Sequence, residues 1–77
     1  MVTPDQCRAA RSLIRMSQSD LANAAGLSTQ TIVDFERGAR TPHRNNLAMI
    51  VSALEAAGVE FIDENGGGVG VRFRDRS

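Results

Sequence analysis

The chain has 77 residues, of which 42% are apolar, and its nine arginines balance nine acidic residues. We expect a chain of this length and ordinary apolar content to form one domain over 1–77, which excludes a wholly disordered protein. No apolar run reaches the ~18 residues of a membrane-spanning helix, and the N-terminus lacks a basic segment followed by an apolar one, so we expect neither a transmembrane helix nor a signal peptide.

The first predicted helix spans 4–15. Thr3 can cap it, Pro4 suits the first helical position, and Gln6 completes a capping box with Thr3. The single cysteine, Cys7, falls on the apolar side of this helix and cannot form an internal disulfide, which fits a reducing cytoplasm. We interpret Cys7 as a small core residue, and a reactive thiol is the alternative.

Two short helices are predicted next, over 18–25 and 29–37. Ser17 and Ser28 can cap them, and Gly26 can adopt the left-handed conformation that ends the first of them. Neither helix is long enough to be stable alone in water. Helices joined by so short a turn cross at roughly 90–120°, so we expect the flanking helices to cover their apolar faces.

A fourth helix is predicted over 45–57, after a loop in which Pro42 prevents helix continuation. Beyond it the apolar residues alternate, over 59–62 and again over 69–74. The glycine-rich stretch 65–68 lies between these two runs, so the C-terminal part is predicted to be a β-hairpin. A flexible tail is the alternative interpretation.

The stretch from Gln18 to Arg37 resembles the helix-turn-helix of the phage repressor and Cro family, often called the Xre type. The matching residues are Leu21, Ala22, Gly26, Leu27 and Ile32, with Ser17-Gln18 before them and Phe35-Glu36-Arg37-Gly38 after them. Arg15 departs from the family, which often has a small residue there. The resemblance covers about 7–59 and implies a mostly α fold, a four-helix lambda-repressor-like DNA-binding domain (4–58) followed by the hairpin (59–74).

The helix over 29–37 is then the expected recognition helix. Its outward residues, the candidates for base contacts, are Thr29, Gln30, Val33 and Asp34. Gln30 can make a bidentate contact with adenine, and Thr29 offers a hydroxyl to a base and a methyl to thymine. Val33 either contacts a thymine methyl or packs locally. Asp34 either accepts from a cytosine amine, or is solvated or paired with Arg37.

Positive charge is concentrated around this unit, with six arginines against three acidic residues over 8–44 and three against five over 45–77. The candidate phosphate-contacting residues are Gln18, Thr31, Arg37, Arg40, Thr41, Arg44 and Asn45. Gln18 lies at a helix start, where free amides favour a phosphate, and the resemblance implies this contact. A merely solvated loop over 39–45 is the alternative.

Arg11 has two interpretations. It could contact a phosphate, or it could pair with Glu36 at the end of the recognition helix. The resemblance implies the ion pair, which we favour. If the pair is partly buried, it is a structural element rather than a contributor to specificity.

The resemblance also implies a homodimer that binds inverted half-sites about 34 Å apart. An isolated hairpin is marginal in water, and an edge strand invites pairing. We therefore hypothesise that the C-terminal strands pair across a two-fold axis, as in Cro-like proteins. The residues expected in this contact are Val59, Phe61, Val69, Val71 and Phe73.

The function expected from these features is a cytoplasmic, sequence-specific DNA-binding transcriptional regulator, a repressor that binds double-stranded DNA. With one His, one Cys and a triple glycine that precedes a strand rather than a helix, we expect no enzymatic activity, cofactor or metal. Two alternatives stay open. One is an antitoxin that represses its own operon, with a toxin or antirepressor as partner. The other is a protein-interaction module without DNA binding, which the zero net charge and Asp34 favour.

Overall fold

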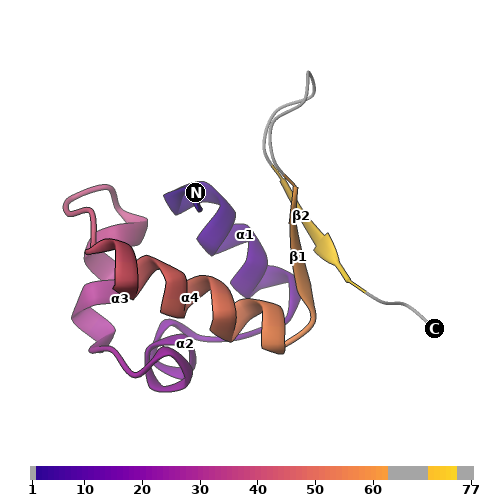
Figure 1. The fold of residues 1–77 in the computed structure, drawn as a ribbon, viewed down its shortest axis with the longest axis horizontal. Helices are drawn as coiled ribbons and strands as arrows, with labels where there is room; N and C mark the ends of the chain where they lie inside the picture. The colour runs from indigo at the N-terminus through magenta and orange to yellow at the C-terminus, as the bar shows by residue number, and fades with distance from the viewer. Residues whose placement is uncertain (1, 63–69, 75–77) are drawn as a thin grey trace.

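The computed structural model describes residues 2–62 and 70–74, which form four helices and two strands. They are α1 (Pro4–Leu13), α2 (Gln18–Ala25), α3 (Thr29–Glu36), α4 (Arg44–Ala56), β1 (Val59–Ile62) and β2 (Gly70–Phe73). The two strands stand beside α1, at the end of the molecule opposite α3 (Figure 1). This confirms the predicted mostly α fold with a C-terminal hairpin. Among the described residues, no helix is both long enough and apolar enough to cross a bilayer.

α1, α2 and α3 begin at the predicted caps. Thr3 Oγ1 accepts from the amide of Gln6 at 3.1 Å, and the Gln6 side chain accepts from the amide of Thr3 at 3.0 Å. Ser17 and Asp20 form a second capping box, and Ser28 caps α3. Each cap satisfies amides that the helix leaves unpaired, which stabilises a helix by about 1 kcal/mol.

The helix ends differ from the prediction by one or two residues. α1 ends at Leu13 rather than at 15, because Arg15 has a φ of +56° and turns the chain toward α2. Gly26 takes the predicted left-handed conformation, with a φ of +73°. α3 ends at Glu36, one residue early, and α4 is shifted one residue toward the N-terminus, beginning at Arg44.

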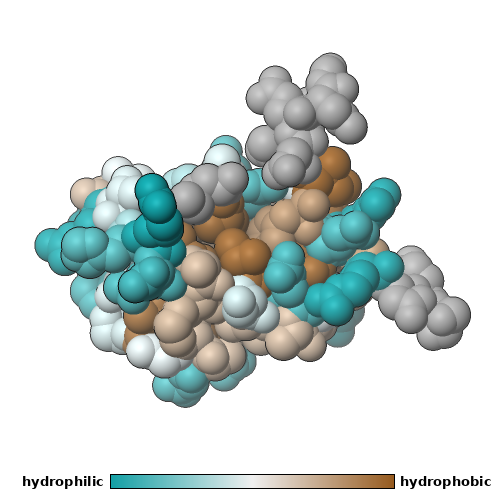
Figure 2. Space-filling model, in the orientation of Figure 1, coloured by the Kyte–Doolittle hydropathy of each residue, from teal (hydrophilic) through white to brown (hydrophobic). Residues whose placement is uncertain are grey.

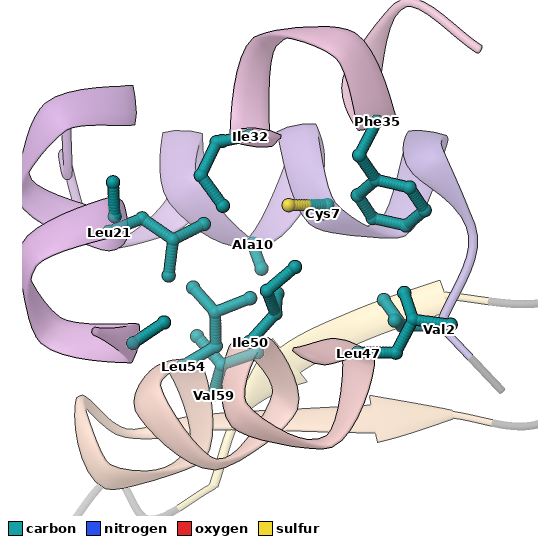
Figure 3. Close-up of a cluster of buried hydrophobic side chains, with 12 residues drawn as sticks. Val2, Cys7, Ala10, Leu21, Ile32, Phe35, Leu47, Ile50, Leu54 and Val59 are labelled. Carbon is teal, nitrogen blue, oxygen red and sulfur yellow. The ribbon is translucent and has the colours of Figure 1, made fainter. Parts of the chain in front are cut away.

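The apolar core lies between the four helices and β1 (Figure 3). Its wholly buried side chains are Cys7, Ala10, Leu21, Ile32, Ile50, Leu54 and Val59. Ile50 and Leu54 of α4 belong to the same buried cluster as Ala10 of α1 and Ile32 of α3. Burial of each large apolar side chain stabilises the fold by roughly 1.5–3 kcal/mol. The eight-residue helices α2 and α3 therefore persist because the core covers their inner faces.

The two strands form an antiparallel hairpin, as predicted. The register pairs Val59 with Phe73, Glu60 with Arg72, Phe61 with Val71 and Ile62 with Gly70. Arg72 Nε donates to Glu60 Oε1 at 2.9 Å on the outer face. Val69 and the glycine-rich turn over 65–68 lie outside the described residues.

The apolar residues of the hairpin are covered to different degrees. Val59 is wholly buried in the core, so its cover comes from its own chain rather than from a second copy. Phe61 and Val71 are partly buried against the core, and Phe73 is 40% exposed. Of the described residues expected at a dimer contact, Phe73 is therefore the most exposed.

Gln6 attaches the hairpin to α1. Its side chain is buried, and Nε2 donates to the carbonyl oxygens of Gly70 at 3.1 Å and Ile62 at 3.4 Å. The same carboxamide accepts from Thr3 in the capping box. One side chain thus both begins α1 and satisfies two carbonyl oxygens, one from each strand.

We expect Gln6→Ala to lower the free energy of unfolding by about 2 kcal/mol, because a cap and two partly buried hydrogen bonds to strand carbonyls are lost together. Thr3→Ala is the control, since it removes only the cap and should cost about 1 kcal/mol. Urea denaturation measures both losses. Hydrogen exchange should become faster in β1 and β2 for Gln6→Ala only. Equal exchange in both variants would contradict the proposed anchoring role.

Candidate functional site

The helix pair α2 and α3 presents the outward face of α3 at one end of the molecule. Ile32 and Phe35 are buried behind this helix. Thr29 and Gln30 are exposed, and Val33 and Asp34 are half-buried. The four residues predicted for base contacts therefore lie on the side of α3 away from the core.

Asp34 links the polar side chains on this face. Its Oδ1 accepts from Gln30 Nε2 at 2.9 Å and from Arg37 Nε at 3.3 Å. The hydrogen bond from Gln30, followed by that from Arg37, holds the pKa of Asp34 below its usual value despite partial burial. Of the two interpretations of Asp34, pairing with Arg37 is the one present in the structure. The Gln30 carboxamide is thereby oriented, with Oε1 and a second N–H left for other partners.

An open groove of about 480 Å³, which we call the α1–α3 groove, runs beside the outward face of α3. It is lined by Arg8, Arg11, Ser17, Gln18, Val33, Glu36 and Arg37. Val33 is half-buried and borders this groove, so part of its side chain is reachable from outside. The lining holds three arginines and one carboxylate.

Glu36 and Arg11 form the predicted ion pair at the base of the groove. Arg11 Nε donates to Glu36 Oε2 and Arg11 Nη2 to Glu36 Oε1, both at 2.7 Å. Only 3% of the Glu36 side chain and 18% of the Arg11 side chain are exposed. Arg11 Nη1 also donates to the carbonyl of Met16 at 3.0 Å. Each of its terminal groups is thus engaged within the chain, which favours the structural interpretation over a phosphate contact.

Two further side chains donate to Glu36. Gln18 Nε2 donates to Oε1 and Cys7 Sγ donates to Oε2, both at 3.1 Å. Burial tends to raise the pKa of Glu36, but the hydrogen bonds from Arg11, Cys7 and Gln18 outweigh it and hold the pKa below its usual value. One carboxylate therefore connects α1, α2 and α3. We call these four residues the Glu36 cluster.

Cys7 is a core residue, as predicted. Burial, together with its hydrogen bond to Glu36, raises the pKa of the Cys7 thiol far above its usual value. Because the thiolate is the reactive form, a buried and protonated thiol is inert. The alternative of a reactive cysteine is therefore not favoured. Among the described residues, His, Cys, Asp and Glu side chains form no group of three that could hold a metal ion.

The candidate phosphate-contacting residues lie on both sides of α3. Gln18 is half-buried in the α1–α3 groove, and Thr31 is half-buried with Oγ1 2.8 Å from the hydroxyl of Ser28. The exposed members, which lie just after α3, in the following loop and at the start of α4, are Arg37, Arg40, Thr41, Arg44 and Asn45. Figure 2 shows hydrophilic side chains gathered over this end of the molecule.

Arg8 is a groove residue to which sequence reasoning assigned no role. Its guanidinium donates to the carbonyl of Glu36, the last residue of α3, and to the carboxylate of Asp5. The signal that could have identified it is its position three residues before Arg11, which places both arginines on one side of α1.

Comparisons with known proteins show what this chain is similar to. A family model described as helix-turn-helix matches residues 8–61. A solved structure is also similar, described as the solution NMR structure of the DNA-binding domain of the P22 C2 repressor (1–76), compared with that of the 434 repressor. It has a TM-score of 0.66 and 27% sequence identity, over 71% of this chain and 72% of that chain. No curated protein gives a significant match.

We expect Arg11→Met to lower the free energy of unfolding by about 3–5 kcal/mol, because Glu36 would keep its burial but lose its charged partner. Urea denaturation followed by circular dichroism measures the loss. Arg40→Met is the matched control, since Arg40 is exposed in the loop and its replacement should change stability by no more than about 0.5 kcal/mol.

The double variant Arg11→Met with Glu36→Gln separates charge from packing. It removes the uncompensated charge, so it should recover part of the loss seen in Arg11→Met. Equal stability of Arg11→Met and Arg40→Met would show that the ion pair does not support the fold.

Proposed function

This chain belongs to the helix-turn-helix family, and we propose that it is a sequence-specific DNA-binding transcriptional regulator that acts as a repressor. The family assignment and the likeness to a repressor DNA-binding domain support the general role. The observation that carries the proposal is the outward face of α3, where exposed Thr29 and Gln30 stand on a helix whose other side is buried. A polar helix supported in this way fits the major groove.

Base contacts come from the outward face of α3 in this proposal. Gln30 approaches adenine with its Oε1 and its second N–H, while Asp34 holds the other N–H and fixes the amide plane. Thr29, at the start of α3, reaches a neighbouring base. Val33 contacts a thymine methyl from the edge of the α1–α3 groove. Asp34 acts on specificity through Gln30 and Arg37 rather than through a cytosine.

Phosphate contacts hold α3 in register from two directions. Gln18 and Arg37 face the DNA strand that passes the α1–α3 groove. The polar loop and the start of α4 meet the backbone through Arg40, Thr41, Arg44 and Asn45, and Thr31 adds a hydroxyl. These contacts position the protein and carry no sequence information directly.

A homodimer supplies a second recognition helix for a second half-site. One recognition helix alone contacts too few base pairs to find its site in a genome. We place the dimer contact on the hairpin, with the partly buried Phe61 and Val71 and the exposed Phe73 as its apolar residues. Val69 belongs to the same predicted strand. The hairpin lies opposite α3, so pairing there leaves both recognition helices uncovered (Figure 1).

Footprinting on the chain's own upstream DNA tests the proposal. We expect two protected half-sites, and an affinity that falls ~10³–10⁵-fold between 50 and 200 mM salt for ~6–10 phosphate contacts. Gln30→Ala should change the preferred sequence, whereas Arg44→Ala should weaken all sequences alike. Absence of protection at low salt would reject the repressor and favour an interaction module.

The dimer contact has a separate test with two exposed apolar residues. Phe73 is 40% exposed on β2 and Met49 is 46% exposed on α4. Phe73→Glu should convert the dimer to a monomer in light scattering, because the two copies would bring like charges together, and deletion of 65–77 should do the same. Met49→Glu should leave the dimer intact. A dimer that survives Phe73→Glu and is lost with Met49→Glu would place the contact on α4.

A further inference from the structure

We propose that Arg8 is a further DNA phosphate contact and that Asp5 restrains it in the free protein. This inference rests on the proposed DNA-binding function. Arg8 lines the α1–α3 groove together with Gln18 and Arg37, and 48% of its side chain is exposed. It therefore faces the same space as two residues already proposed to contact the backbone.

The charge that the groove offers to an anion is carried mainly by Arg8 and Arg37. Arg11, the third arginine in the lining, is neutralised by its bidentate pair with the buried Glu36. Arg37 is held by Asp34 at 3.3 Å and is largely exposed. Arg8 is thus one of two guanidinium groups in the groove that can turn donors toward a ligand.

The contacts of Arg8 hold its side chain at the groove without using all of its donors. One terminal nitrogen donates to the carbonyl of Glu36 at the end of α3, and the other donates to the carboxylate of Asp5. A guanidinium has five donors in a planar fork, so Arg8 can keep its bond to α3 while it binds a phosphate oxygen. The bond to Glu36 preorganises the side chain.

Asp5 is the partner that a phosphate would replace. Its side chain is 83% exposed, and it lies one helical turn before Arg8 on α1. An exposed ion pair of this kind contributes little to stability, so replacing Asp5 by a phosphate as the partner of Arg8 loses little folding free energy. The carboxylate of Asp5 also repels an approaching phosphate. Asp5 therefore weakens the binding of a DNA phosphate by Arg8.

The test compares the salt dependence of DNA binding in Arg8→Gln and Asp5→Asn, using the operator DNA found by footprinting. Arg8→Gln keeps a polar side chain of helix-forming type but removes the charge. It should weaken all sequences and reduce the slope of log K against log salt by about 0.9 for each bound chain. Asp5→Asn should tighten binding about two- to five-fold at 50 mM salt, which is the scale of an exposed ion pair.

Arg72→Gln, checked by light scattering to keep the oligomeric state of the wild type, is the matched control, because it removes the same charge at the opposite end of the molecule from α3 and should leave the slope unchanged. A wild-type slope in Arg8→Gln would overturn the phosphate contact, even if affinity and thermal stability fell. Failure of Asp5→Asn to tighten binding would overturn the restraint. If the wild-type chain binds DNA but the two variants do not show these effects, only this inference is rejected. If the wild-type chain binds no DNA, the proposed function itself is rejected.

Discussion

The Glu36 carboxylate is the single group on which the arrangement of α1, α2 and α3 depends. Burial of an isolated carboxylate costs several kcal/mol, so this residue is tolerated only when its donors converge on it. Arg11 and Cys7 come from α1 and Gln18 from the start of α2. Because the donors come from two helices and all meet at one buried carboxylate, the cluster ties the end of α3 to α1 and α2 in addition to the apolar packing.

The position of α3 follows from this cluster and from the core. α3 has eight residues and would not persist alone, but Ile32 and Phe35 are buried behind it and Glu36 ties down its last turn. On the outward face, Asp34 accepts from Gln30 and Arg37, and Thr29 Oγ1 donates to Ser19 Oγ of α2 at 3.4 Å. The hairpin is attached separately, through Gln6 and Val59, at the other end. Under the proposed function, the α3 end of the molecule contacts DNA and the hairpin end contacts a second copy.

Local signals made most of the fold predictable. Caps at Thr3, Ser17 and Ser28 and the left-handed Gly26 are encoded within three or four residues, so the helices were placed to within two residues. The end of α1 was missed because the residue with positive φ is Arg15 rather than a glycine, so the sequence gives no signal for the helix end. The resemblance to phage repressor and Cro proteins was confirmed, and it supplied the pair of Arg11 with Glu36.

The side-chain network of the site was predictable only in part. Exposure of Gln30 follows from the helical period, but its bond to Asp34 needs a particular rotamer. The roles of Gln6 and Arg8 depend on partners 64 and 28 residues away, which only the packed fold brings together. The donation from Cys7 to Glu36, 29 residues apart, is of the same kind. Apart from the pair of Arg11 with Glu36, which the resemblance supplied, sequence reasoning found residues whose role is local and missed those that join distant elements.

The most direct test of this account is an NMR titration of the Glu36 side-chain carboxyl in the folded chain. Because Arg11, Cys7 and Gln18 stabilise the charged form, the pKa should lie below the ~4.3 of an unperturbed glutamate. A pKa at or above that value would mean that burial outweighs the donors. The Glu36 cluster would then not be the element that fixes the position of α3.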